Sequence, residues 1–281
     1  METIYLNSTS NGPQEAGEDA RSMEFLQTET RGDVALIGLN RPDKRNAISD
    51  AFIEELEVAI TAAERTAKAG VIHGIGPHFC AGLDLAEHVK KSQFEGIRGS
   101  QRWHRVFDRI HRGKLPWFAA LHGAVVGGGL ELASSAQVRI ADTTAFFALP
   151  EGQRGIFVGG GGSVRTARLM GTARMTDLML TGRSVDADTA ERWNIVQYVV
   201  PPGAALAKAI ELAARAATNA EMSNYAIINA LPRIQDMGSD DGLFVESFIA
   251  AFTSTSPEAE ERLNAFLTKR AGKVARPGED G

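Results

Sequence analysis

The sequence has little cysteine: Cys80 is the only one among 281 residues, so neither an internal disulfide nor a multi-cysteine metal site can form within the chain. This usage is typical of a reducing compartment, and we expect a cytoplasmic protein. No run of about 18 apolar residues occurs, which argues against a transmembrane helix and a membrane partner. The six histidines show no metal-ligand spacing, so no metal site is predicted.

Excess positive charge is also missing. The formal net charge is -5, which disfavours general binding to nucleic acid. The polar and acidic residues 1–22 contain neither a basic start nor an apolar stretch, so they predict a disordered tail and not a signal peptide. Because 281 residues are close to the upper size of a single core, we expect one core over 23–215, a helical region over 216–270 and a second tail over 271–281.

Short apolar runs that alternate with helical stretches predict an α/β fold. Strands are expected at Asp33–Asn40, Gly70–Ile75 and Trp117–Leu121. Ser49 is expected to cap a helix between the first two strands, and an apolar stripe within 103–110 indicates another helix before the third. This order is typical of a parallel sheet with right-handed crossovers. From about residue 201 onward only helical segments are predicted.

Two glycine runs stand beside predicted helix starts. Gly127–Gly129 follows the third strand and its turn, and Gly159–Gly162 precedes a predicted helix, Ser163–Met170. Backbone N–H groups at a helix start lack intrahelical partners, so such a run can bind an oxyanion. Neither run ends in the Gly-Lys-Ser/Thr sequence of a phosphate-binding loop, which argues against nucleotide chemistry.

Two glutamates lie near these runs, Glu131 directly after the first run and Glu151 20 residues later. A predicted strand, Gln137–Ala141, separates them, so both carboxylates could face one cavity. Glu131 stands between two leucines, and apolar surroundings raise the pKa of a carboxyl group. With the unpaired N–H groups, the pair predicts an acid–base site.

Four ordered segments carry a family resemblance: residues 39–47 (LNRPDKRNA), 79–85 (FCAGLDL), 122–132 (HGAVVGGGLEL) and 149–152 (LPEG). On these motifs the chain resembles the crotonase superfamily of enoyl-CoA hydratases and isomerases. The resemblance implies a ββα spiral with a C-terminal helical trimerisation region, and a homo-oligomer, usually a hexamer made of two trimers. It also implies an acyl-CoA substrate, coenzyme A being part of that substrate, and no separate cofactor.

The same resemblance implies roles for individual residues. The backbone N–H groups of Leu83 and Gly128 would hold the thioester oxygen, while Glu131 and Glu151 would activate water and supply the proton at the α-carbon. Four further positions match the path of coenzyme A: Lys44, Ala81, Asp84 and Leu85.

A finer similarity lies in residues 148–165 and 173–182, which resemble the methylthioacryloyl-CoA hydratases of bacterial dimethylsulfoniopropionate degradation. That group is implied to hydrate the double bond and then hydrolyse the thioester, releasing CoA, methanethiol, acetaldehyde and CO2. One alternative is a general short-chain enoyl-CoA hydratase that stops at the 3-hydroxyacyl-CoA. Another is a crotonase-like RNA-binding protein, against which the acidic charge and the intact glutamate pair argue.

Other candidates have simpler interpretations. Cys80 has no ordered base partner in the sequence, so we expect buried packing and not a nucleophile. Arg154 and Arg165 lie near the site segments and could steer a phosphate, but surface positions are expected. The acyl pocket is expected to come largely from an irregular stretch, 87–113, and from the C-terminal helices.

Overall fold

The computed structural model describes residues 23–89 and 91–270, which form two β-sheets and surrounding helices. The larger sheet has the order β1-β2-β3-β4-β6-β9 and the smaller one the order β5-β7-β8. The strands of the larger sheet are β1 (Leu26–Arg31), β2 (Val34–Leu39), β3 (Ala69–Gly74), β4 (Trp117–Leu121), β6 (Val138–Asp142) and β9 (Tyr198–Val200). Those of the smaller are β5 (Ala124–Val126), β7 (Phe146–Ala148) and β8 (Ser184–Asp186).

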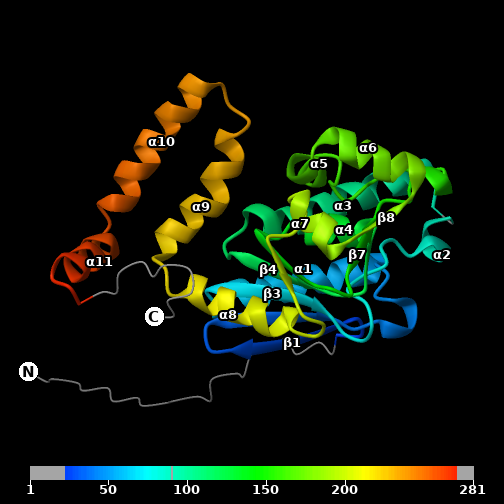
Figure 1. Cartoon of the computed structure of the whole chain (residues 1–281), viewed down its shortest axis with the longest axis horizontal. Coiled ribbons are helices and arrows are strands. Elements are labelled where there is room, and N and C mark those ends of the chain that lie inside the picture. Colours follow the sequence, from blue (N-terminus) through cyan, green and yellow to red (C-terminus); the bar gives the residue numbers. More distant parts are fainter. Residues whose placement is uncertain (1–22, 90, 271–281) are drawn as a thin grey trace, which may run out of the picture.

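Helices connect the strands and form the whole C-terminal part of the described chain (Figure 1). They are α1 (Asp50–Thr66), α2 (Leu85–His88), α3 (Gln93–Arg112), α4 (Gly128–Ala133), α5 (Arg165–Met170), α6 (Thr172–Thr181), α7 (Ala187–Arg192), α8 (Ala205–Ala217), α9 (Glu221–Ile234), α10 (Ser239–Ser254) and α11 (Pro257–Leu267). Short 3-10 helices occur at Pro42–Lys44 and Gly152–Arg154. No described helix has the length and apolar character needed to cross a bilayer.

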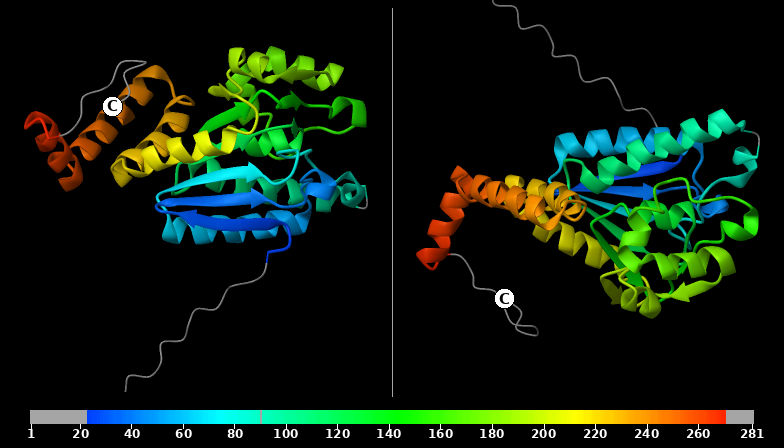
Figure 2. Two further views of the ribbon diagram at one scale, coloured as in Figure 1. Left: turned by 60° about the horizontal axis from the view of Figure 1, so that its bottom comes forward. Right: turned by 90° about the horizontal axis from the view of Figure 1, so that it is seen from above.

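The larger sheet is covered on both faces, which explains why its inner strands are apolar throughout. In β2, Val34 and Leu36 face a cluster formed with α8, while Ala35 and Ile37 face the main core shared with α1. Helix α8 lies across one face through four buried alanines, whose small side chains permit a close approach (Figure 2). The three predicted strands and their parallel pairing are confirmed.

The predicted helix cap is confirmed as well. The Ser49 hydroxyl accepts a hydrogen bond from the Phe52 N–H at the start of α1, and α3 buries the predicted apolar stripe. Strand β1 was not predicted, because five of its six residues are exposed and only Leu26 is buried. A strand that contacts the core at one position has no apolar pattern to detect.

Two features differ from the sequence prediction. The stretch 87–113, expected to be irregular, is mostly the helix α3, which starts with a capping box at Ser92 and Glu95. The predicted helix Ser163–Met170 begins two residues later, at Arg165, because the preceding glycines form a loop. The predicted tails, 1–22 and 271–281, lie outside the described residues.

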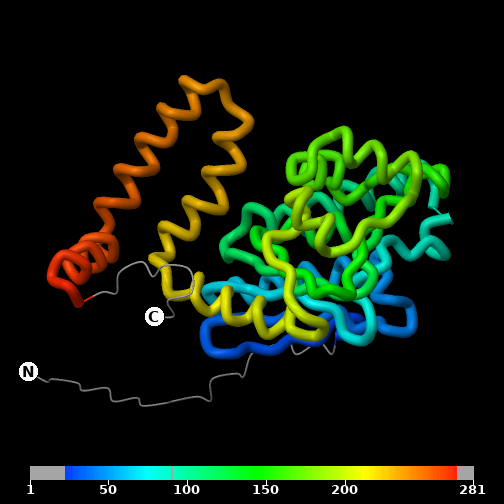
Figure 3. The backbone as a smooth tube through the Cα atoms, in the orientation of Figure 1, coloured from blue at the N-terminus to red at the C-terminus, as the bar shows by residue number. Residues whose placement is uncertain are grey.

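Helices α9, α10 and α11 leave the body of the molecule, as the tube in Figure 3 shows most clearly. Helix α10 packs against α9, and α11 packs against α10. Large apolar side chains stay exposed on the last two helices: Leu243, Phe244, Phe248, Phe252, Leu263, Phe266 and Leu267. The fold is therefore an α/β spiral body with a projecting helical region.

Candidate active site

Strand β5 joins the segments that carry the candidate residues. On one side it pairs in parallel with β7, Val126 facing Ala148, and the Gly127 N–H donates to the Ala148 carbonyl over 2.9 Å. On its other side Cys80 forms a parallel bridge with Val125. The residues after Cys80, the start of α4 and the residues after β7 therefore meet at the end of this strand.

The two predicted oxyanion donors are neighbours. A Cβ atom placed on Gly128 would lie 3.4 Å from the Leu83 nitrogen, and one placed on Gly82 would lie 3.0 Å from the Gly128 nitrogen. Gly82 has a φ of +94°, which turns the chain toward α4 and is a conformation that favours glycine. Within the described residues, neither the Leu83 N–H nor the Gly128 N–H donates a hydrogen bond. Both remain available to an oxygen atom in the cavity.

Glu131 is buried on α4, with 3% of its surface exposed. Its Oε1 accepts hydrogen bonds from the Gly160 and Gly162 N–H groups, each over 2.8 Å. Burial raises the pKa of this carboxyl group, and the two N–H donors partly oppose the change. The second glycine run thus binds a side chain of the protein itself, a contact that the sequence did not indicate.

Glu151 lies just after β7 and is 5% exposed, but its surroundings differ from those of Glu131. Its Oε2 has no hydrogen-bond partner among the described residues. Burial raises the pKa of Glu151 to about 7, and the nearby Glu131 charge acts in the same direction. At neutral pH this carboxyl group is therefore divided between its acid and anionic forms.

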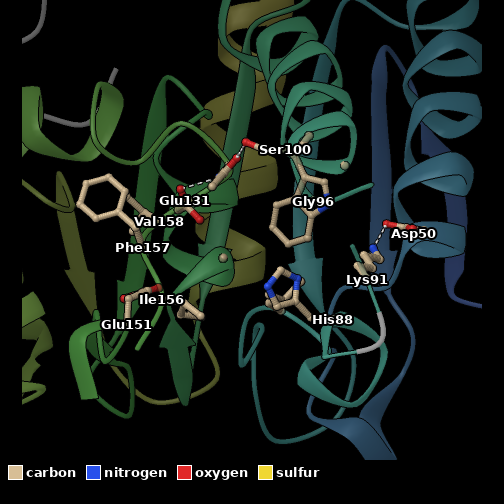
Figure 4. A pocket seen from close by; sticks show the side chains of 16 residues that line it. Asp50, His88, Lys91, Gly96, Ser100, Glu131, Glu151, Ile156, Phe157 and Val158 are labelled. Atoms are coloured by element: carbon tan, nitrogen blue, oxygen red, sulfur yellow. Dashed lines mark hydrogen bonds and ion pairs between the residues drawn. The ribbon is translucent and has the colours of Figure 1, made fainter. Parts of the chain in front are cut away.

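Both glutamates line one cavity that opens to solvent, and its empty space, the open mouth included, is about 590 Å³ (Figure 4). Leu83 and Gly128 line it too. The remaining lining residues come from three regions: Asp50, His88 and Lys91 near α2; Gly96, Gly99, Ser100 and Trp103 on α3; and Ile156, Phe157, Val158, Gly159 and Gly160 in the loop before α5. The structure thus brings all four predicted catalytic and oxyanion residues to one space.

The four residues expected along the coenzyme A path do not line this cavity. They lie on two adjoining segments at its edge: the Ala81 N–H donates to the Arg45 carbonyl, and the Asp84 carboxylate pairs with Arg41 over 3.0 Å. Lys44 is exposed in the 3-10 helix, and Leu85 begins α2.

The buried Asn46 fastens these two segments. Its side-chain amide donates to the carbonyl oxygens of Ile75, His78 and Phe79, and its Oδ1 accepts from the Arg41 N–H. The segment that leads to Leu83 is therefore held by hydrogen bonds to the loop that contains Lys44.

Two other candidates have defined environments. Burial raises the pKa of the Cys80 thiol to about 12, and its Sγ donates to the Asn46 carbonyl, so it is not a nucleophile. Arg165 was expected at the surface, and this was wrong: it is 9% exposed and its guanidinium donates to the Gly160 carbonyl. The loop that binds Glu131 also contacts the Arg165 guanidinium, through the Gly160 carbonyl and beside Gly161, and nothing in the local sequence indicates that contact.

Sequence reasoning also missed individual cavity residues such as His88, Lys91 and Ser100. The one available signal was the pair of glycines inside α3, Gly96 and Gly99, which interrupt an otherwise amphipathic helix. Among the described residues, no group of three or more acidic, histidine or cysteine side chains is arranged to hold a metal ion.

The α/β spiral, with two buried carboxylates beside two free backbone donors, defines a protein of the crotonase superfamily. The model of the enoyl-CoA hydratase/isomerase family matches residues 29–274, and the chain belongs to this family. The enoyl-CoA hydratase EchA19 of Mycobacterium tuberculosis is 29% identical, the match covering 92% of this chain and 96% of that protein. The short-chain-enoyl-CoA hydratase of Clostridium acetobutylicum is 31% identical, and the match covers 86% of this chain and 94% of that protein.

Solved structures agree with this membership. A Rhodopseudomonas palustris protein, named as a candidate enoyl-CoA hydratase, superposes with a TM-score of 0.85. It is 49% identical to this chain, and the match covers 89% of this chain and 97% of that one. The predicted α/β crotonase-like fold class is therefore confirmed.

Proposed function

We propose that this protein adds water across the α,β-double bond of an enoyl-CoA. The carrying observation is the contrast between two buried carboxyl groups in one cavity: Glu131 accepts two N–H bonds, whereas one oxygen of Glu151 has no partner. Hydrogen-bond donors favour the anionic form of a carboxyl group, while burial without donors favours the neutral acid. On this contrast we assign Glu131 as the base and Glu151 as the acid.

The chemical steps follow from this contrast. The thioester oxygen accepts from the Leu83 and Gly128 N–H groups, which stabilise the negative charge that develops there. Glu131 takes a proton from water as the water oxygen bonds to the β-carbon, and the double-bond electrons move onto the thioester as an enolate. Glu151 then gives its proton to the α-carbon. The net change is the addition of H and OH.

We further propose methylthioacryloyl-CoA as the substrate, on the resemblance of residues 148–165 and 173–182. Hydration would be followed by attack at the thioester carbonyl by water that Glu131 directs, and the thioester C–S bond would break with release of CoA and the free acid. If Glu131 itself attacks, CoA leaves first and water then hydrolyses the mixed anhydride, which releases the acid and restores Glu131. The resulting acid carries a hydroxyl and a methylthio group on one carbon. Loss of methanethiol and decarboxylation of the 3-oxo acid then give acetaldehyde and CO2.

A second candidate is a general short-chain enoyl-CoA hydratase that stops at the 3-hydroxyacyl-CoA. The match to the short-chain-enoyl-CoA hydratase of Clostridium acetobutylicum favours it. The two candidates share every residue of the hydration step and differ in whether the thioester is broken.

Incubating the protein separately with methylthioacryloyl-CoA and crotonyl-CoA distinguishes the candidates. The readouts are loss of enoyl absorbance, free CoA thiol and methanethiol. Methanethiol and CoA from the first substrate support hydration plus hydrolysis. Loss of absorbance without free CoA supports the general hydratase, and unchanged absorbance with both substrates contradicts hydration altogether.

Variants test the two glutamates directly. Glu131→Ala and Glu151→Ala should each lower turnover by roughly 100-fold or more, because acid–base groups contribute about 10² to 10⁴-fold. Glu57→Gln is a matched control, since that exposed carboxylate lies on α1 and pairs with no other side chain that the structure describes. Near-normal rates in both glutamate variants would overturn the assignment.

We also propose a homo-oligomer, with a hexamer as the expected form, because exposed phenylalanine and leucine side chains of α10 and α11 lack cover in a single chain. Light scattering should give a mass near six chains. A monomer mass at micromolar concentration would contradict this proposal.

A further inference from the structure

One face of α3 forms a wall of the cavity. Gly96, Gly99, Ser100 and Trp103 all line it, and their spacing of three and four residues places them on one side of the helix. The loop Ile156–Val158 also lines the cavity, and Figure 4 shows it apart from α3, with Glu131 between them. We call the space bounded by these α3 residues and this loop the acyl chamber.

The two glycines of this wall are costly inside a helix, each by about 1 kcal/mol relative to alanine. Neither has a positive φ that would require glycine. A Cβ atom on Gly96 would meet nothing within 4 Å, and one on Gly99 would meet only the Lys91 Nζ at 3.9 Å. Backbone conformation and internal packing therefore do not explain these glycines. What they do is leave the acyl chamber wide.

Trp103, in contrast, fills space beside the reacting groups. It is 7% exposed, and its ring packs against two glycines of the site. A Cβ atom on Gly128 would lie 2.8 Å from the nearest ring atom, and one on Gly160 would lie 2.9 Å from the ring atom nearest to it. Phe107 supports the ring from behind, with the two ring centres 5.4 Å apart. The indole thus closes the acyl chamber next to an oxyanion donor and the loop that binds Glu131.

A separate observation indicates that a ligand occupies this space. Glu151 lines the same cavity, and its Oε2 atom is buried and has no partner among the described residues. A buried carboxyl oxygen without a partner carries a desolvation cost that a bound substrate or its attacking water can offset. The small residues of α3 therefore face a ligand site and not a packing gap.

We infer that the acyl chamber selects short but broad acyl groups: Gly96 and Gly99 give it width and Trp103 limits its length. The substrate class is an enoyl-CoA whose β-carbon carries a branched alkyl or alkylthio group and few atoms beyond. This inference rests on the proposed hydration and adds which residues set its specificity.

Width is tested with Gly99→Ala and Gly99→Val, using crotonyl-CoA as the narrow substrate and 4-methylpent-2-enoyl-CoA as the broad one. We expect Gly99→Val to lower the ratio of kcat/KM for the broad substrate over kcat/KM for crotonyl-CoA at least tenfold. Gly99→Ala should show the same bias more weakly while raising the melting temperature, since alanine favours the helix. Gln101→Ala, an exposed position of α3, is the control.

The outcomes separate the two levels of the proposal. If the wild-type protein hydrates both substrates and the Gly99 variants lose neither or both equally, the width inference is wrong while hydration stands. If the wild-type protein hydrates neither substrate, the proposed function fails and the inference fails with it.

Length is tested with Trp103→Phe and Trp103→Ala. Opening the closed end should raise the ratio of kcat/KM for oct-2-enoyl-CoA over crotonyl-CoA at least tenfold in the alanine variant. The phenylalanine variant keeps an aromatic ring in the core, so it should fold and give a smaller rise even if the alanine variant does not. An unchanged ratio in every variant that folds overturns the role of Trp103.

Discussion

Glu151→Gln should make the protein more stable at alkaline pH while impairing its chemistry. The carboxyl group is 5% exposed, and its pKa is raised from 4.5 to about 7 by burial. A group whose folded pKa is raised stabilises the fold fully below its unfolded pKa, and this contribution is lost as pH rises through the folded value. The wild-type protein therefore carries a penalty above pH 7 that the amide variant lacks.

The size of this penalty follows from the two pKa values, since one pKa unit corresponds to about 1.4 kcal/mol. With its pKa raised from 4.5 to about 7, Glu151 lowers the free energy of unfolding by about 3 kcal/mol at pH 8 and by about 1 kcal/mol at pH 5. The buried amide has its own cost, but that cost is the same at both pH values. The change in the stability difference between pH 5 and pH 8 therefore reports the ionisation of Glu151 alone.

Urea denaturation of the wild-type and Glu151→Gln proteins at pH 5 and pH 8 measures this difference, at one fixed protein concentration. The variant should gain about 2 kcal/mol in free energy of unfolding, relative to wild type, between pH 5 and pH 8. Glu57→Gln, at an exposed carboxylate of α1 that pairs with no other described side chain, is the control and should show no such gain. An equal offset at both pH values would refute the reasoning and place the pKa of Glu151 near its ordinary value.

Three further results are expected. The value of kcat/KM should fall about tenfold per pH unit above pH 7, because the proton donor Glu151 ionises with a pKa of about 7, and a rate independent of pH up to 9 would contradict this role. Iodoacetamide should leave Cys80 unlabelled in the folded protein at pH 8 and label it in urea, as mass spectrometry can detect, because burial raises the thiol pKa to about 12. Arg165→Met should lower kcat tenfold or more, because the Arg165 guanidinium donates to the Gly160 carbonyl in the loop that binds Glu131. It should also move the acidic limb of the pH profile to higher pH, because the Arg165 charge lowers the pKa of Glu131. Arg165→Lys should restore part of both effects, and an unchanged acidic limb in Arg165→Met would exclude the electrostatic role.

The parts of the fold that could be predicted are those whose signal is local. Strand β4 matches its predicted range because every residue of it is buried, and α1 begins after its predicted cap because Ser49 bonds to a residue three positions on. Strand β1 escaped prediction since its pairing with β2 uses backbone bonds, while its side chains are mostly exposed.

The candidate site divides in the same way. Glu131 and Gly128 belong to one short segment, so a single motif places both of them. The bonds from Gly160 and Gly162 to Glu131 span about 30 residues and depend on how a loop folds back over α4, which no local pattern records. Arg165 was misjudged because its guanidinium turns back to donate to the Gly160 carbonyl, five residues earlier, and the side chain so stays 9% exposed.

The position of β5 between two partners has a consequence for how such a site can change through evolution. Main-chain hydrogen bonds along this strand set the spacing of the oxyanion donors and the segments that bear both glutamates, whatever side chains surround them. The acyl chamber, in contrast, is built from side chains of α3 and one loop. Substitutions at Gly96 and Gly99, where a Cβ atom would meet neither the oxyanion donors nor the loop that binds Glu131, can therefore exchange one acyl preference for another without moving the reactive groups. A laboratory library restricted to these two positions should yield new specificities while preserving the hydration chemistry.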